Sequence, residues 1–353
     1  MYHSRQSQER EVAVKATDRR SLGKSGIETT LLGLGGAPLG DLYEVIPESR
    51  AAETIETAYR LGARLFDTAP LYGMGVSEHR FGAVLRQKPH ERDDFVMCTK
   101  VGRYLVPQDR SSVDRSVFKG GLDFRLVADY SYDGTMRAID QSFQRLGMNR
   151  IDVAHIHDVD VQTWGEEGYR QRFKEASDGA FRALAELRSQ GVIKAVGVGV
   201  NEIGPLLDFA AAGDYDCFML AGRYTLLQPQ ALDELLPLCE SRGIGVLTAG
   251  PYNSGILATG ARPGAMYNYK PAPQPILDRV AQIEAVAARH GVPLAAAAIQ
   301  FPLAHPAVSA MVPGAVRPSE VEANVALIEH PIPGDFWAEL KHENLLRADA
   351  PTP

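Results

Sequence analysis

A regular alternation between short apolar runs and segments of helical periodicity constrains the fold of this chain more than any other feature. The apolar runs are about six residues long and rich in β-branched residues, as strands buried on both faces of a sheet should be. They predict strands at residues 31–36, 64–69, 95–101, 151–157, 195–200, 217–221, 245–249 and 308–312.

Segments of helical periodicity separate and follow these runs. They predict helices over residues 48–61, 77–86, 135–146, 179–190, 206–212, 232–241, 276–290 and 320–328. Several end at a glycine, as helices commonly do. Strands that alternate with helices predict an α/β fold with a parallel sheet, and eight such units are the number that closes a (β/α)8 TIM barrel. An open, doubly wound sheet is the alternative.

The chain outside these units is predicted to form a tail, a hairpin and three long connections. Residues 1–19 have no apolar periodicity and are expected to be a flexible tail, with a single barrel domain over residues 20–345. Two short runs around a Gly-Lys-Ser-Gly turn predict an N-terminal β-hairpin at residues 20–30. The long connections all follow strands, so we expect them on the C-terminal face, where barrel enzymes build their active sites. They cover residues 102–134, 158–178 and 251–275.

Charge and composition exclude several classes of partner. The net charge is −7, which disfavours nucleic acid, because binding to a phosphate backbone needs a basic face. No apolar run approaches the roughly 18 residues of a membrane span, so no membrane partner is expected. The three cysteines show no CxxC spacing and the N-terminus has no apolar segment, which together indicate a reducing, cytoplasmic setting. The oligomeric state is left open.

Four residues that can carry chemistry follow neighbouring predicted strands. Asp67 and Lys100 lie at the ends of the second and third strands, His157 ends the fourth, and Tyr72 follows Asp67 by five residues. Adjacent strands are about 4.8 Å apart, so side chains at the same height can meet. We therefore expect a carboxylate, a phenol, an ammonium and an imidazole at one place.

This set suits the transfer of a hydride to or from a nicotinamide cofactor, with a coupled proton. A phenol titrates near pH 10 in isolation, and we expect the charge of Lys100 to lower the pKa of Tyr72. Asp67 would hold Lys100, and His157 would orient the substrate oxygen. Tyr72 would then exchange the proton as general acid or base.

Other interpretations of these residues stay open. Taken singly, a strand-terminal aspartate is often a helix cap and a tyrosine is often a turn residue. His155 and His157 form the His-x-His pattern of barrel metal hydrolases, but later strands supply Asn201, Arg223 and glycines rather than ligands, so no metal is expected. A Schiff-base aldolase that uses Lys100 is a further alternative. His155 lies deeper on its strand and is expected to be a core residue.

An ordered series of motifs resembles the aldo-keto reductase family over residues 20–331. The motifs are Leu-Gly-Leu-Gly-Gly-Ala at 32–37, Phe-Asp-Thr-Ala-Pro-Leu-Tyr-Gly at 66–73, Thr-Lys-Val-Gly at 99–102, Ile-Asp-Val-Ala-His-Ile-His-Asp at 151–158, Gly-Val-Gly-Val-Asn at 197–201 and Val-Pro-Gly-Ala at 312–315. The resemblance implies a barrel that binds a nicotinamide cofactor, with Asp67, Tyr72, Lys100 and His157 as catalytic residues and Tyr72 as the general acid/base.

The resemblance also implies cofactor contacts. Asn201 matches the residue that holds the nicotinamide carboxamide, although Val200 stands where the family usually has serine. Glu320 would repel the 2′-phosphate of NADP and favours NAD, whereas Arg317 keeps NADP possible. The full set expected to contact the cofactor is Asn201, Gly250, Gly255, Ile256, Leu257, Gly314, Arg317, Glu320 and Asn324.

Within the family, the sequence is similar to the branch of aldose 1-dehydrogenases, with pyridoxal 4-dehydrogenase close by. This implies oxidation of the C1 hydroxyl of a sugar such as L-fucose, L-galactose or D-arabinose to a lactone. Pyridoxal oxidation, general aldehyde or ketone reduction, and a cofactor-binding regulatory subunit without catalysis are the alternatives. A sugar site needs polar groups and an aromatic wall, and the candidates are Tyr130, Tyr132, Trp164, Arg223 and Asn253.

Overall fold

The computed structural model describes residues 14–353. In that part of the chain, eight strands form one parallel sheet in which each strand is hydrogen-bonded to the next. In sheet order they are β3 (Leu34–Gly35), β4 (Leu65–Asp67), β5 (Val96–Val101), β8 (Val153–His157), β9 (Ala195–Val200), β10 (Cys217–Ala221), β11 (Gly245–Ala249) and β14 (Val308–Val312). Each predicted apolar run contains one of these strands.

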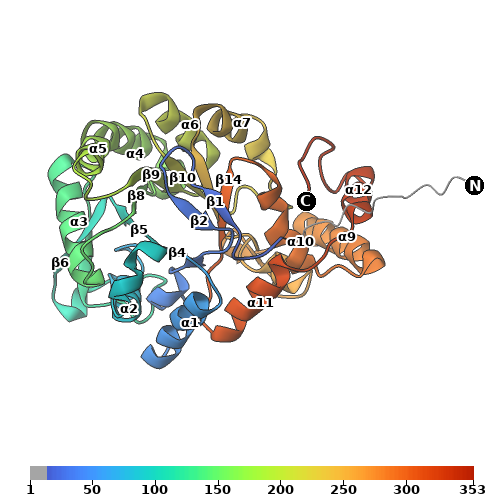
Figure 1. The fold of residues 1–353 in the computed structure, drawn as a ribbon, viewed down its shortest axis with the longest axis horizontal. Coiled ribbons are helices and arrows are strands. Elements are labelled where there is room, and N and C mark those ends of the chain that lie inside the picture. Colours follow the sequence, from blue (N-terminus) through green and yellow to red (C-terminus); the bar gives the residue numbers. More distant parts are fainter. Residues whose placement is uncertain (1–13) are drawn as a thin grey trace, which may run out of the picture.

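The first and last strands of this sheet also pair with each other. Leu32 bridges to Met311 and Gly35 bridges to Gly314, both in parallel orientation. The N–H of Gly33 donates to the carbonyl of Met311 at 2.8 Å. The sheet is therefore closed, and Figure 1 shows it surrounded by helices. The prediction of a (β/α)8 barrel is confirmed.

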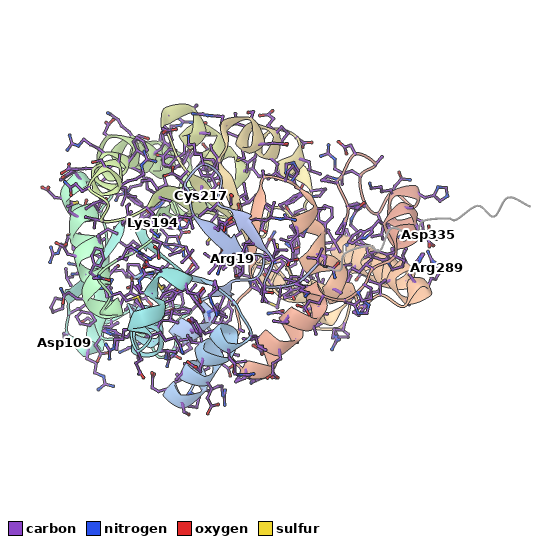
Figure 2. The ribbon with its side chains drawn as sticks, viewed as in Figure 1. Arg19, Asp109, Lys194, Cys217, Arg289 and Asp335 are labelled. Carbon is purple, nitrogen blue, oxygen red and sulfur yellow. The ribbon has the colours of Figure 1, made fainter. Side chains whose placement is uncertain are left out.

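The helices around the barrel match the predicted helical segments to within a few residues. They are α1 (Glu48–Arg60), α2 (Val76–Leu85), α3 (Tyr132–Leu146), α5 (Phe181–Ser189), α6 (Ile203–Ala212), α7 (Leu235–Arg242), α9 (Gln274–His290) and α11 (Pro318–Ile328). Figure 2 labels Cys217 within the barrel, and Arg289 and Asp335 on the helices that lie farthest from it.

Three helices of seven or more residues lie where no helix was predicted. One is α4 (Val161–Glu175), in the connection expected to be a loop. Its first turn is capped by Asp160, which accepts from the N–H of Thr163 at 2.8 Å. The sequence did not predict this helix because Tyr169 is the one residue of it that is buried, which gives no apolar period. Gly165, with a φ of 68°, also interrupts the helix. The other two are α10 (Leu294–Gln300), which has no polar face to give a period, and α12 (Gly334–His342).

The N-terminal hairpin is confirmed, and the packed chain begins before it. β1 (Arg19–Ser21) pairs antiparallel with β2 (Glu28–Thr30). The hairpin is fixed to the barrel by Arg20, whose Nη1 donates to the carbonyls of Leu303 and Val308. Ala16, inside the predicted tail, is buried and its carbonyl accepts from the N–H of Leu32. Residues 1–13 of that tail lie outside the described residues.

The other two long connections contain short hairpins. β6 (Arg103–Pro107) pairs with β7 (Phe124–Ala128) after β5. The connection after β11 carries α8 (Ile256–Thr259) and the pair β12 (Met266–Tyr267) and β13 (Lys270–Pro271). Within residues 14–353, the structure has no helix that is both long and apolar enough to cross a bilayer.

Gly82 allows α2 and α3 to approach each other. A β-carbon at Gly82 would lie 2.4 Å from the carbonyl oxygen of Leu146. We expect Gly82→Ala to lower the free energy of unfolding by about 1–3 kcal/mol, because backbone cannot move aside as a side chain can. Urea denaturation measures this. Gly204→Ala in α6 is the matched control, since nothing lies within 4 Å of that position. Equal effects of the two substitutions would contradict the steric argument.

Candidate active site

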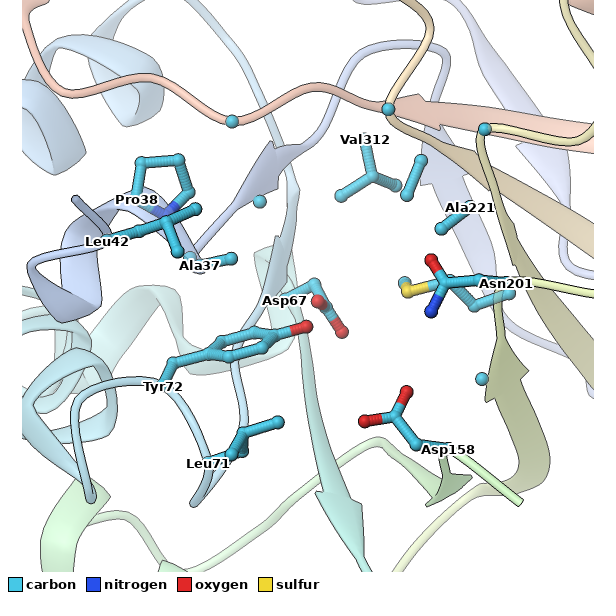
Figure 3. A pocket seen from close by; sticks show the side chains of 18 of the residues that line it. Ala37, Pro38, Leu42, Asp67, Leu71, Tyr72, Asp158, Asn201, Ala221 and Val312 are labelled. Carbon is cyan, nitrogen blue, oxygen red and sulfur yellow. The ribbon is translucent and has the colours of Figure 1, made fainter. Parts of the chain in front are cut away.

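A cavity of about 470 Å³ lies at the C-terminal ends of the barrel strands. Figure 3 shows it from close by, with the Tyr72 hydroxyl, the Asp67 carboxylate and the Asn201 amide pointing into it. Of the residues predicted to form the site, those that line the cavity are Asp67, Tyr72, Lys100, His157, Asn201, Arg223, Gly250, Asn253 and Gly314.

A buried ion pair forms the floor of this cavity. Lys100, near the end of β5, donates from Nζ to Asp67 Oδ1 at 2.8 Å and to Oδ2 at 2.6 Å. It also donates to the carbonyl of Thr68 at 2.9 Å. The two side chains are 2% and 4% exposed, so water does not screen the pair.

Tyr72 and His157 lie against this pair. Lys100 Nζ is 4.8 Å from the centroid of the Tyr72 ring. The rings of Tyr72 and His157 meet edge to face, with 5.8 Å between their centroids. The Phe118 ring also lies near Tyr72, with 6.1 Å between the two ring centroids. The structure thus brings together the four residues that the sequence singled out.

The pKa of Tyr72 departs from the expectation. Burial raises it above its ordinary value, and the charge of Lys100 opposes that shift without overcoming it. Lys100 lowers the pKa of Tyr72, as predicted, but the expectation that this pKa falls below its ordinary value is wrong. The main reason is burial, and the charges of Asp67 and Asp158 raise the pKa of Tyr72 further. Burial lowers the pKa of Lys100, but the charges of Asp67 and Tyr72 raise it by more. The net pKa of Lys100 is above its ordinary value, so Lys100 stays an ammonium.

Both histidines of β8 are neutral at pH 7. Burial and then the charges of Lys100 and Arg103 hold the pKa of His157 well below its usual range. A neutral imidazole can donate one hydrogen bond and accept another. Burial also lowers the pKa of His155, to about 3, and its Nε2 lies 3.7 Å from Cys217 Sγ. His155 is fully buried deeper in the barrel, as predicted for a core residue.

Most of the residues predicted to contact the cofactor lie outside the cavity lining. Ile256 and Leu257 are fully buried at the start of α8, so their side chains belong to the core. Arg317 is half exposed and forms ion pairs with Glu320 at 3.8 Å and Glu44 at 4.0 Å. The remaining three are Gly255, which precedes α8, Glu320, which accepts from the N–H of Val316 at 2.8 Å, and Asn324, which accepts from the hydroxyl of Tyr252 at 2.6 Å.

Two of the five predicted substrate residues line the cavity. Arg223 Nη1 donates to Asn268 Oδ1 at 2.9 Å, and Asn253 Nδ2 donates to the carbonyl of Gly222 at 3.1 Å. These contacts hold both side chains at the cavity wall. Their hydrogen-bonding groups suit a polar ligand.

The three aromatic candidates do not line the cavity. Tyr130 is fully buried, and its hydroxyl donates to the carbonyl of His157 at 2.7 Å. Trp164 Nε1 donates to the carbonyl of Asp158 at 2.7 Å. The hydroxyl of Tyr132 donates to Glu186. Tyr130 and Trp164 therefore hold the chain at the end of β8 through hydrogen bonds to its backbone carbonyls.

Sequence reasoning missed Asp158, Tyr43 and Tyr269, which all line the cavity. Asp158 directly follows His157, and that position was a signal that could have been used. Tyr43 and Tyr269 lie in connecting segments with left-handed φ angles of 67° and 62°. No periodicity in the sequence brings those two segments to the same cavity.

Comparison with protein families decides which kind of barrel this is. The model of the aldo/keto reductase family matches residues 31–344. The chain belongs to the aldo/keto reductase family. Aldo-keto reductases are oxidoreductases that use nicotinamide cofactors and act on small molecules. In the described residues of this aldo-keto reductase, no group of three or more His, Cys, Asp or Glu side chains could hold a metal ion.

Two relatives resemble the aldo-keto reductase over nearly its whole length. It is 41% identical to a pyridoxal 4-dehydrogenase from Microbacterium luteolum, over 94% of this chain and 99% of the relative. It is 37% identical to a D-threo-aldose 1-dehydrogenase from a Pseudomonas species, over 93% of this chain and 97% of the relative.

A solved structure has the same fold. It is an aldo-keto reductase from Bacillus halodurans, with a TM-score of 0.72, 24% sequence identity and coverage of 95% of this chain and 98% of that one.

Two buried histidines should make stability depend on pH. Below about pH 6.5 the unfolded chain binds protons at His155 and His157 that the folded protein does not, because their folded pKa values are lowered. The free energy of unfolding should then fall by about 1.4 kcal/mol for each histidine with every unit by which the pH decreases. We expect His155→Gln to remove the contribution of one histidine from the slope of the free energy of unfolding against pH, between about pH 6 and about pH 5. Urea denaturation at each pH measures this slope.

The control is His342→Gln, because His342 is exposed in the folded protein. It should leave the slope unchanged. A slope that is the same in His155→Gln as in the unsubstituted protein would contradict the lowered pKa of His155.

Proposed function

We propose that this aldo-keto reductase oxidises the C1 hydroxyl of an aldose to a lactone, with NAD as hydride acceptor and Tyr72 as general acid/base. The observation that carries the proposal is the meeting of Tyr72, Lys100, Asp67 and His157 in one cavity. The polar side chains of Arg223 and Asn253 in that cavity and the similarity to a D-threo-aldose 1-dehydrogenase support a sugar as the substrate.

The residues at the end of β9 fit the nicotinamide end of the cofactor. Asn201 offers an amide donor and acceptor to the cavity, as a carboxamide requires. Gly222 and Gly250 line the same cavity. The space next to them is open, because a β-carbon at either position would lie at least 3.6 Å from any neighbouring atom. Bound there, the cofactor supplies the two-electron acceptor of the reaction.

In the proposed reaction the electron pair of the C1–H bond leaves as a hydride, and the proton of the C1 hydroxyl passes to Tyr72. His157 donates a hydrogen bond to the same oxygen in its neutral form and fixes the position of C1. Lys100 stabilises the phenolate of Tyr72, and Asp67 keeps Lys100 in place. The raised pKa of Tyr72 favours its phenol form, so oxidation needs a higher pH than carbonyl reduction.

Pyridoxal is the second candidate substrate. The relative that is 41% identical is a pyridoxal 4-dehydrogenase. The aromatic side chains of Tyr43, Phe118 and Tyr269 line the cavity and can pack on a flat ring as well as on the apolar face of a sugar. Steady-state assays of L-fucose, L-galactose, D-arabinose and pyridoxal with NAD and NADP decide between the two.

The choice of NAD rests on the charges around Arg317. Arg317 pairs with Glu44 and Glu320. The two negative charges reduce the attraction of Arg317 for a 2′-phosphate. A ribose hydroxyl could instead donate to either carboxylate. We propose that these two glutamates select NAD over NADP.

Removal of the Tyr72 hydroxyl tests the proposed acid/base. Tyr72→Phe should lower kcat for aldose oxidation by about two to four orders of magnitude and leave cofactor affinity unchanged. In the unsubstituted enzyme, kcat/KM for oxidation should rise from about pH 7 to about pH 10, because the raised pKa of Tyr72 makes its phenolate scarce at neutral pH. Initial rates and fluorescence titration with the cofactor measure both. Full turnover by the variant would rule out Tyr72 as the acid/base.

Removal of one glutamate charge tests the cofactor preference. Glu320→Gln keeps an acceptor for the N–H of Val316 but frees part of the charge of Arg317. We expect the ratio of kcat/KM with NADP to that with NAD to rise by about twofold to fivefold. Glu322→Gln on the same helix is the control, because Glu322 pairs with Arg60 instead. A ratio that changes equally in both variants would contradict a role for Glu320.

A further inference from the structure

Asp158 lines the cavity with its backbone in an unusual conformation. It directly follows β8 and has a φ of 49°. This left-handed region is unfavourable for residues with a β-carbon, although aspartate and asparagine tolerate it better than most. Such conformations persist where surrounding contacts impose them, and they are concentrated at functional sites.

Hydrogen bonds to both of its peptide groups impose this conformation. The N–H of Asp158 donates to the carbonyl of Gly199 at 2.9 Å. Its carbonyl accepts from Trp164 Nε1 at 2.7 Å and from the hydroxyl of Tyr130 at 3.5 Å. The two aromatic residues therefore act on the cavity indirectly, because they fix the place of Asp158.

The carboxylate of Asp158 points into the cavity, as Figure 3 shows. Its Oδ2 lies 3.2 Å from Arg103 Nη1, and its Oδ1 lies 3.4 Å from His157 Nε2. The side chain is 14% exposed. Burial raises the pKa of Asp158, and the charge of Arg103 opposes that shift.

The carboxylate has room for further donors. An ionised carboxylate offers about four lone-pair directions, and Arg103 occupies part of that capacity. A partly buried carboxylate is stabilised by each hydrogen bond it accepts. The Tyr72 hydroxyl and the Asp158 carboxylate both point into the cavity, so a ligand whose oxygen meets Tyr72 can present another group to Asp158.

We propose that Asp158 is a specificity-determining residue that accepts a hydrogen bond from a second hydroxyl of the sugar, other than the one that is oxidised. It thereby selects substrates with that hydroxyl over analogues that lack it. Arg103 is a positioning residue for this contact. The inference rests on the proposed function, because it concerns the substrate of the same cavity.

A set of deoxy sugars tests this assignment. The kcat/KM of the unsubstituted enzyme is measured for the aldose that it oxidises best and for each monodeoxy analogue of that sugar. One analogue should react about tenfold to a hundredfold less well, the range for a lost hydrogen bond to a charged group. In Asp158→Gly, which keeps the left-handed backbone without strain, that preference should fall to near unity.

Two further variants keep the test decisive. Asp158→Asn preserves the shape and the backbone conformation without the charge, and should weaken the preference by several fold even if Asp158→Gly does not fold. Asp133→Asn changes an exposed carboxylate at the start of α3 and should leave the preference unchanged.

The outcomes separate the inference from the proposed function. If the unsubstituted enzyme oxidises no aldose, both are overturned. If it oxidises an aldose but both Asp158 variants lose activity on the sugar and on every deoxy analogue alike, Asp158 has a structural role and only the inference fails.

Discussion

Two opposite charges taken out of water hold the site of this enzyme together. Lys100 and Asp67 come from neighbouring strands, and each is nearly fully buried. Neither charge would be stable there alone, because the cost of removing an ion from water exceeds what one or two neutral hydrogen bonds return. Together with the carbonyl of Thr68 they form a fixed point at the C-terminal end of the barrel. The cavity and the rings of Tyr72 and His157 are arranged around this point.

The same pair limits how acidic Tyr72 can be. Burial disfavours the phenolate most, and the charge of Asp67 opposes part of the stabilisation that Lys100 supplies. Tyr72 is therefore a protonated phenol at neutral pH. His157 stays neutral for the same physical reason, since a second buried cation beside Lys100 would be unstable.

Several residues act on the cavity through others. Tyr130 and Trp164 were predicted to contact the substrate, yet their polar ends bind the carbonyls of His157 and Asp158. They fix the chain where it leaves β8. A large aromatic with one polar group is suited to this task, because its ring fills space in the core while its donor satisfies a buried carbonyl.

The sequence alone determined the order of the eight barrel strands and of eight helices, the closed barrel and the four residues that meet in the cavity. Periodicity reports burial, and strand ends place Asp67, Lys100 and His157 at one height whatever the loops do. The directions of side chains in the long connections were decided by tertiary structure. Tyr130 and Trp164 bind backbone carbonyls at the end of β8, while the exposed side chains of Tyr43 and Tyr269 line the cavity. The tertiary structure also decided the pKa of Tyr72. This pKa depends on burial and on every neighbouring charge, and local sequence reveals neither.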